Sequence, residues 1–80
     1  MESFVFRNLE AELARAGVSK VTLARVLSVS VSTLYAKLRG ERDFKLEEME
    51  RIRSYLERET GSELTIDYVF DKTVKKVSSF

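Results

Sequence analysis

The chain has 80 residues, 44% of them hydrophobic, and a formal net charge of +1. This length suits one small domain near the lower limit for a core that folds unaided, and the hydrophobic fraction is too high for a disordered tail. Cys, His and Pro are absent, which excludes disulfides, thiolate metal sites and histidine-based catalysis and favours helices. No apolar run reaches the length of a membrane span, and the N-terminus lacks the features of a secretion signal. We therefore expect a mainly α, cytoplasmic protein.

Charge is distributed unevenly along the chain. Residues 13–45 carry seven basic and two acidic side chains, whereas residues 46–67 carry seven acidic and three basic ones. A domain of this kind can present its basic end to phosphates while its acidic end faces away. The alternative is an ordinary solvated surface with a chance asymmetry, because charge runs are weak signals on their own.

The first predicted helix spans residues 4–16, with Ser3 as its N-cap. Gly17 follows it, at a point where a left-handed C-terminal cap favours a residue without a Cβ. The apolar positions recur every three or four residues and form one stripe: Phe6, Leu9 and Leu13.

Residues 18–40 contain four basic residues and no acidic one. They predict two short helices, over residues 20–27 and 31–39, which Ser19 and Ser30 cap. The predicted turn between them is Ser28-Val29-Ser30, and Gly40 ends the second helix. The side chains expected to face inward are Leu23, Ala24, Leu27, Leu34 and Leu38. Two short helices with one cationic polar face indicate a helix-turn-helix that docks on a polyanion.

A fourth helix is predicted over residues 45–60 and ends at Gly61. One face of it is apolar: Leu46, Met49, Ile52 and Leu56. The tail then alternates apolar and polar residues, which favours a β-strand, with residues 73–80 as a weaker second strand of a hairpin. The alternating apolar residues are Leu64, Ile66, Tyr68 and Phe70. A short helix over residues 66–70 is the alternative, because apolar runs this short are ambiguous.

The stretch over residues 18–56 resembles the phage repressor and Cro-like helix-turn-helix family. The matching elements are Ser19, Leu23-Ala24, Val29-Ser30, Ser32-Thr33-Leu34, Arg39-Gly40 and the apolar stripe of the fourth helix. The resemblance implies a four- to five-helix repressor-like domain over residues 1–61, with the helix-turn-helix at 19–39, followed by a tail over residues 62–80. Two positions depart from the family pattern. Ser28 stands where Gly is usual, and Lys37 stands where an aliphatic residue is usual, which predicts a slightly rotated recognition helix.

The predicted base readers are the outward residues near the start of the recognition helix, Val31, Ser32 and Tyr35. Val31 can pack on a thymine methyl group, Ser32 can hydrogen-bond to any base, and the Tyr35 hydroxyl can contact a base or a phosphate. None of them is a bidentate Arg, Asn or Gln, so we expect modest direct readout, helped by DNA shape. Packing or a protein contact is the alternative for Val31 and Tyr35, and helix capping for Ser32.

The predicted phosphate contacts lie at the start of the second helix and around the recognition helix: Ser19, Lys20, Thr22, Lys37, Arg39, Arg42 and Lys45. For any single Lys or Arg, the alternative is a solvated surface side chain.

The resemblance implies a small Cro-like transcriptional regulator of phage origin, associated with the bacterial nucleoid, which binds operator DNA as a homodimer. We expect dimerisation through the tail at Leu64, Ile66, Tyr68 and Phe70, or else packing of the tail on the chain's own core. No enzyme activity, cofactor, metal, membrane contact or small-molecule ligand is expected. The alternative function is a protein–protein module such as an antirepressor, antitoxin or repressor modulator.

Overall fold

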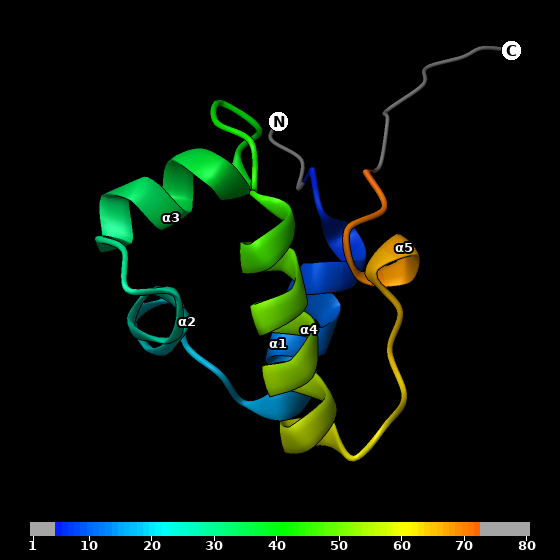
Figure 1. Ribbon diagram of the computed structural model, residues 1–80. Helices are drawn as coiled ribbons and strands as arrows, with labels where there is room; N and C mark the ends of the chain where they lie inside the picture. The colour runs from blue at the N-terminus through cyan, green and yellow to red at the C-terminus, as the bar shows by residue number, and fades with distance from the viewer. Residues whose placement is uncertain (1–4, 73–80) are drawn as a thin grey trace, which may run out of the picture.

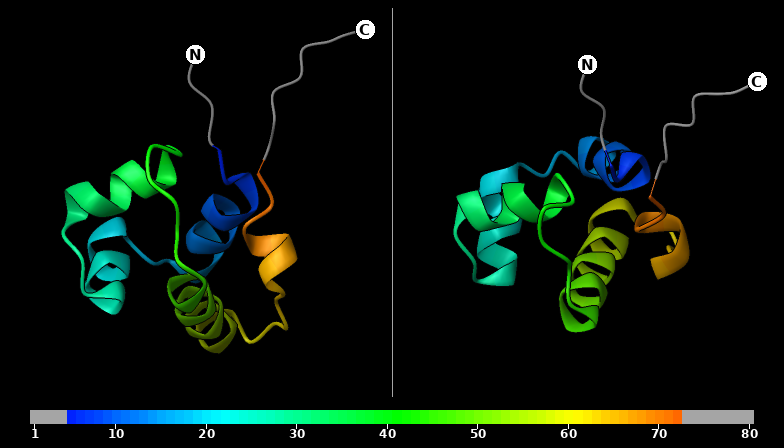
Figure 2. Two further views of the ribbon diagram at one scale, coloured as in Figure 1. Left: turned by 45° about the horizontal axis from the view of Figure 1, so that its top comes forward. Right: turned by 90° about the horizontal axis from the view of Figure 1, so that it is seen from above.

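Five helices make up the computed structural model, which describes residues 5–72. Their bounds are α1 Arg7–Ala16, α2 Lys20–Leu27, α3 Val31–Leu38, α4 Leu46–Thr60 and α5 Ile66–Val69. The mainly α fold class is confirmed, since residues 5–72 contain no strand. α2 and α3 lie at one end of the molecule and α5 at the other, with α1 and α4 between them (Figure 1; Figure 2).

Local capping explains where the helices start and stop. The hydroxyls of Ser19 and Ser30 each accept a hydrogen bond, 3.1 Å long, from the backbone N–H three residues later. Gly17 and Gly61 follow α1 and α4 in the left-handed conformation, with φ of 69° and 72°. These four caps are where the sequence predicts them.

Two predicted boundaries are wrong by one residue, and one is wrong by more. α3 ends at Leu38 and α4 begins at Leu46, each one residue inside the predicted bound. α1 begins at Arg7 rather than at residue 4, with Phe6 at the N-cap. The predicted cap Ser3 lies outside the described residues. Phe6 has a non-helical backbone, and its side chain packs in the core instead of starting the helix.

The core gathers the inward stripes of all five helices. Its buried hydrophobic residues are Phe6, Leu9, Leu13, Leu23, Ala24, Leu27, Leu34, Leu38, Ile52, Leu56, Leu64 and Val69. One predicted inward residue is wrong: Leu46 is 61% exposed. It stands six residues, or about 9 Å along the helix axis, before the buried Ile52, so it lies beyond the core that the rest of the stripe covers.

The predicted strand over the tail is wrong, and the short-helix alternative is correct. Ile66–Val69 forms α5, which Thr65 caps by accepting a hydrogen bond from the backbone N–H of Tyr68. Val69 is fully buried, and Leu64 is 8% exposed. The helical turn brings Val69 into the same core as Leu64, whereas an extended strand would place positions 64 and 69 on opposite faces. The second predicted strand, over residues 73–80, lies outside the described residues.

Leu64 and Phe70, two of the four residues predicted for dimerisation, contact the chain's own core. Phe70 packs edge-to-face against Phe6 and Phe44, with ring centroids 5.9 and 5.3 Å apart. Ile66 is half-buried, and Tyr68 is 40% exposed. For Leu64 and Phe70 this packing agrees with the alternative that the tail packs on the chain's own core, since burying aliphatic and aromatic area there is stabilising. Phe70 stays half-buried, and a dimer contact through the tail remains a prediction.

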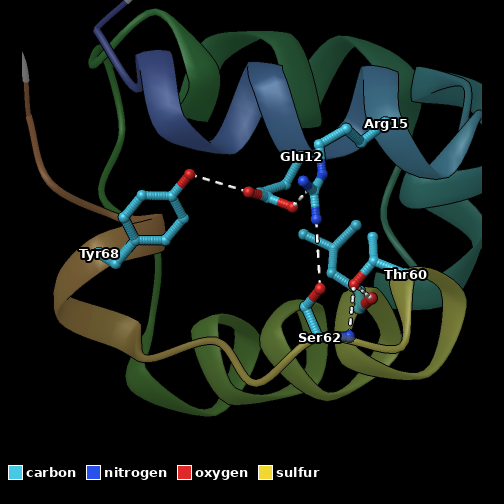
Figure 3. Close-up of polar contacts among 6 residues, drawn as sticks. Glu12, Arg15, Thr60, Ser62 and Tyr68 are labelled. Carbon is cyan, nitrogen blue, oxygen red and sulfur yellow. Dashed lines mark hydrogen bonds and ion pairs between the residues drawn. The ribbon is translucent and has the colours of Figure 1, made fainter.

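A polar network also holds the tail on α1 (Figure 3). Glu12 is only 4% exposed, and its carboxylate accepts a hydrogen bond of 2.8 Å from the Tyr68 hydroxyl. Arg15 pairs with Glu12 at 3.3 Å and donates to the Ser62 hydroxyl at 3.2 Å. Asn8 donates from its side chain to the Tyr68 carbonyl at 2.8 Å. The buried carboxylate thus has partners from both ends of the described chain.

Candidate nucleic-acid interface

The turn between α2 and α3 sets the angle of the candidate interface. The two helix axes are bent by 101°, within the range of helix-turn-helix units. Ser28 adopts the left-handed conformation with φ 60° and ψ 42°, the only non-glycine residue among 5–72 with positive φ. The Val29 N–H donates to the Ala24 carbonyl at 3.0 Å and closes the turn. A serine therefore makes the turn for which the resemblance favours glycine, at a cost of about 1 kcal/mol.

Apolar packing fixes which side of α3 faces out. Leu34 and Leu38 are buried against the inward side chains of α2. The three predicted readers all keep exposed surface: Val31 is 37% exposed, Tyr35 is 41% exposed, and Ser32 is exposed. Their free surface is available to a partner that approaches α3 from outside.

Ser19 and Thr22, two predicted phosphate contacts, bond to each other at the start of α2. The Ser19 hydroxyl accepts from the Thr22 N–H and donates to the Thr22 hydroxyl, both at 3.1 Å. Ser19 is exposed and Thr22 half-buried. The hydroxyls of Ser19 and Thr22 are thus engaged in capping α2. The N-terminus of the helix still presents partial positive charge to solvent.

Lys20 is the first residue of α2, and its side chain lies between α1 and α3. Its ammonium group is 3.0 Å from a carboxylate oxygen of Glu10 and 5.9 Å from the ring centroid of Tyr35. The lysine therefore links the first helix to an exposed residue of the recognition helix. Glu10 was not recognised from the sequence, because nothing local relates a residue of α1 to the start of α2.

The prediction that Lys37 contacts phosphate is wrong, because its side chain is buried. It is 4% exposed, and its ammonium group donates to Glu48 at 2.8 Å and to the Asp43 carbonyl at 3.1 Å. Its place beside Leu34 and Leu38 on the inward face of α3 explains the burial. The lysine occupies the position where the family has an aliphatic residue, and Glu48 of α4 neutralises its charge.

The Glu48 carboxyl responds to this pairing. Burial alone raises the pKa of Glu48, but hydrogen bonds from Lys37 and from the Lys45 backbone N–H outweigh burial and bring the pKa below its ordinary value. The Lys45 N–H donates at 2.9 Å, so Glu48 also closes the start of α4. The Lys37–Glu48 pair thus bridges α3 and α4.

The remaining predicted phosphate contacts follow α3 on the surface. Arg39 is exposed and forms a bidentate pair with Glu41, with N–O distances of 2.8 and 3.1 Å. Hydrogen bonding to Glu41 raises the pKa of Arg39, and the same bond lowers the pKa of Glu41. Arg42 and Lys45 are exposed and form no ion pair within residues 5–72.

The sequence interpretation missed two outward residues of α2. Val21 is 54% exposed and Arg25 is exposed, on the side of α2 opposite its buried residues. The sequence could have predicted their exposure, because residues 21 and 25 are four apart and so share a face of the helix that the inward residues do not occupy. Val21, Val31 and Tyr35 give the outward face of the helix-turn-helix an apolar component beside its cations.

The geometry described above is that of a helix-turn-helix, and a family model agrees. The model of the BetR domain matches residues 1–76. The chain belongs to the BetR domain family. BetR is a small helix-turn-helix-like domain, which is consistent with a helical DNA-binding regulator. Comparison with curated proteins and with solved structures gave no match.

Residues 5–72 contain no group of three or more carboxylates that could hold a metal ion. No single helix in this part of the chain is long and apolar enough to cross a membrane; α2 and α3 pass that test only when joined across their 101° bend.

Proposed function

We propose that this BetR domain is a sequence-specific regulator of transcription that binds operator DNA as a homodimer, in the manner of a small Cro-like phage repressor. The observation that carries the proposal is the outward face of α3. Val31, Ser32 and Tyr35 lie exposed on a helix that a 101° turn projects from the body of the molecule. A helix presented in this way fits the major groove.

The cations available for phosphate define how binding proceeds. Arg42 and Lys45 are exposed and can contact phosphate directly, whereas Lys20 and Arg39 must exchange Glu10 and Glu41 for phosphate oxygens. Each exchange returns a carboxylate to water near the DNA, so these two residues add less affinity than their charge suggests. We expect a moderate non-specific affinity with a shallow salt dependence.

Fluorescence anisotropy with labelled duplexes at several salt concentrations tests the proposal. Lys45→Ala and Arg42→Ala are each expected to lower the slope of log K against log salt by about one unit. Arg53→Gln is the matched control, since Arg53 lies on α4 in a pair with Glu57, and it should leave the slope unchanged. If all the variants have the same salt slope, the proposed docking face is wrong.

Selection from random duplexes, followed by sequencing, tests specificity. The double change Val31→Ala with Ser32→Ala is expected to lower discrimination between selected and random DNA by about 1–3 kcal/mol while the helical circular dichroism signal is kept. An unchanged ratio would assign readout to other residues, with Tyr35 as the next to test.

A protein–protein module is the second candidate function, and the exposed apolar group favours it. Val21, Val31 and Tyr35 are exposed apolar side chains of the helix-turn-helix, and Lys20 and Arg39 are already paired with carboxylates. A protein partner would bury this area without needing free cations. Absence of duplex binding even at low salt would favour this candidate over DNA binding.

A further inference from the structure

The outward face of α4 forms a surface that neither the DNA-facing residues nor the core uses. Ile52 and Leu56 face the core, and a stripe on another side of the helix lines an open hollow of about 330 Å³ beside α2. The residues of the hollow are Val26, Glu47, Glu50, Arg51, Ser54, Tyr55 and Arg58. The α4 members recur every three or four positions, so they run along most of its length.

The two ends of this stripe carry opposite charges, and a further cation, Arg51, lies between them. Glu47 and Glu50 lie toward the N-terminal end of α4, and Arg58 lies toward its C-terminal end. Within residues 5–72 none of the three forms an ion pair, whereas Arg53 and Glu57 of the same helix do, at 3.1 Å. A helix face whose ends have opposite sign is complementary to an antiparallel copy of itself.

We propose that a second copy of this chain docks here, with its α4 antiparallel to the first. A twofold axis midway between Arg51 and Ser54 places Glu47 opposite Arg58 of the second copy. The same axis places Glu50 opposite Tyr55, and Arg51 opposite Ser54. Each contact then occurs twice, as an isologous interface requires. The proposal rests on the proposed function, for which it names the surface that joins two operator-binding units.

The size and polarity of the side chains suit this arrangement. Ser54 is small and lies near the centre of the stripe, where two helices must approach most closely. Tyr55 and Val26 are half-buried within one chain, so they retain apolar area that a second copy can cover. The charged ends set the antiparallel direction, and the apolar area of Tyr55 and Val26 supplies the association. No residue of α3 takes part, so the predicted readers stay exposed in the dimer.

Sedimentation of the full chain without DNA tests the dimer. The wild type is expected to dimerise between about 1 and 100 μM, and Glu47→Arg or Arg58→Glu alone should weaken the dimer at least tenfold, because each puts like charges opposite each other twice. An equimolar mixture of the two variants should dimerise again, since both cross-contacts then join opposite charges. Glu63→Arg, an equal charge change at an exposed residue outside the stripe, is the matched control.

The mixture separates an interface effect from a folding effect. A variant that fails to fold cannot be rescued by another folded or unfolded variant, and circular dichroism reports the helix content of each. A wild type that stays monomeric over this range, a Glu47→Arg variant that stays dimeric, or a mixture that stays monomeric would overturn the interface. Because no DNA is present, failure of DNA binding would overturn the proposed function and leave this result unaffected.

Discussion

The buried pair of Lys37 and Glu48 gives the strongest prediction about stability. The side chains are 5% and 14% exposed, and their charged atoms are 2.8 Å apart. Lys37→Met keeps an unbranched apolar chain of similar length in the α3–α4 contact but removes the ammonium group. Glu48 then keeps only the Lys45 N–H as a partner, at 2.9 Å, and the Asp43 carbonyl loses its donor.

The expected cost follows from what remains around the carboxylate. Removing one member of a buried pair costs about 3–5 kcal/mol, and the residual hydrogen bond and slight solvent contact of Glu48 place this case near about 3 kcal/mol. For a domain of this size, that loss lowers the melting temperature by about 12–24 °C. Thermal and urea unfolding followed by circular dichroism measure it. The double variant Lys37→Met with Glu48→Gln should lose clearly less than the sum of the two single losses.

The pH dependence of unfolding gives a second readout of the same pair. The folded-state pKa of Glu48 lies below its ordinary value of 4.5, so its contribution to stability is present above that pH and is lost as pH falls through the lower folded-state value. Lys37→Met should flatten this acid limb, because the ammonium group no longer favours the charged carboxylate.

Two outcomes of these unfolding experiments would contradict the role of the Lys37–Glu48 pair. If Lys37→Met unfolds at the wild-type midpoint, or if the double variant loses the full sum, the pair contributes nothing and the packing argument is wrong. DNA binding offers an independent check: a buried Lys37 touches no phosphate, so Lys37→Met should keep the wild-type salt slope. A slope lower by about one unit would return Lys37 to the interface.

Three further predictions concern the tail and the turn. Tyr68→Phe should destabilise the fold by about 1.5–3 kcal/mol, since buried Glu12 loses a hydrogen-bond donor. Because the bond to Glu12 raises the pKa of Tyr68 above its ordinary 10.0, the wild type should lose this contribution as pH rises through the higher folded-state value, and Tyr68→Phe should lack that alkaline limb. Ser28→Gly should raise stability by up to about 1 kcal/mol, because φ is 60° there; a lower melting temperature would contradict this. Truncation after Gly61 should lower the free energy of unfolding by about 3 kcal/mol or more, since it removes the fully buried Val69 and exposes the core residues that Val69 covers. An unchanged unfolding midpoint would show that the tail is dispensable.

Local sequence features predicted four of the five helices and four of their caps. Ser19 and Ser30 cap α2 and α3, Gly17 and Gly61 follow α1 and α4, and Ser28-Val29-Ser30 forms the turn between α2 and α3, as predicted. Each of these features depends on residues within one or two helical turns, where a hydroxyl reaches a nearby N–H or a missing Cβ relieves a clash. Features that depend only on such local contacts can be predicted without knowledge of the rest of the molecule.

Which polar side chains are buried, and where the tail lies, depends on contacts between segments far apart in the chain. Lys37 reads as a surface cation until Glu48, eleven residues away, neutralises it inside the α3–α4 contact. Glu12 is buried because Tyr68, 56 residues later, donates to it. The tail alternates like a strand, yet a single helical turn brings Val69 into the core. In each case the free energy depends on a partner from a distant segment, because burying a charge or a short apolar run is favourable only where that partner stands.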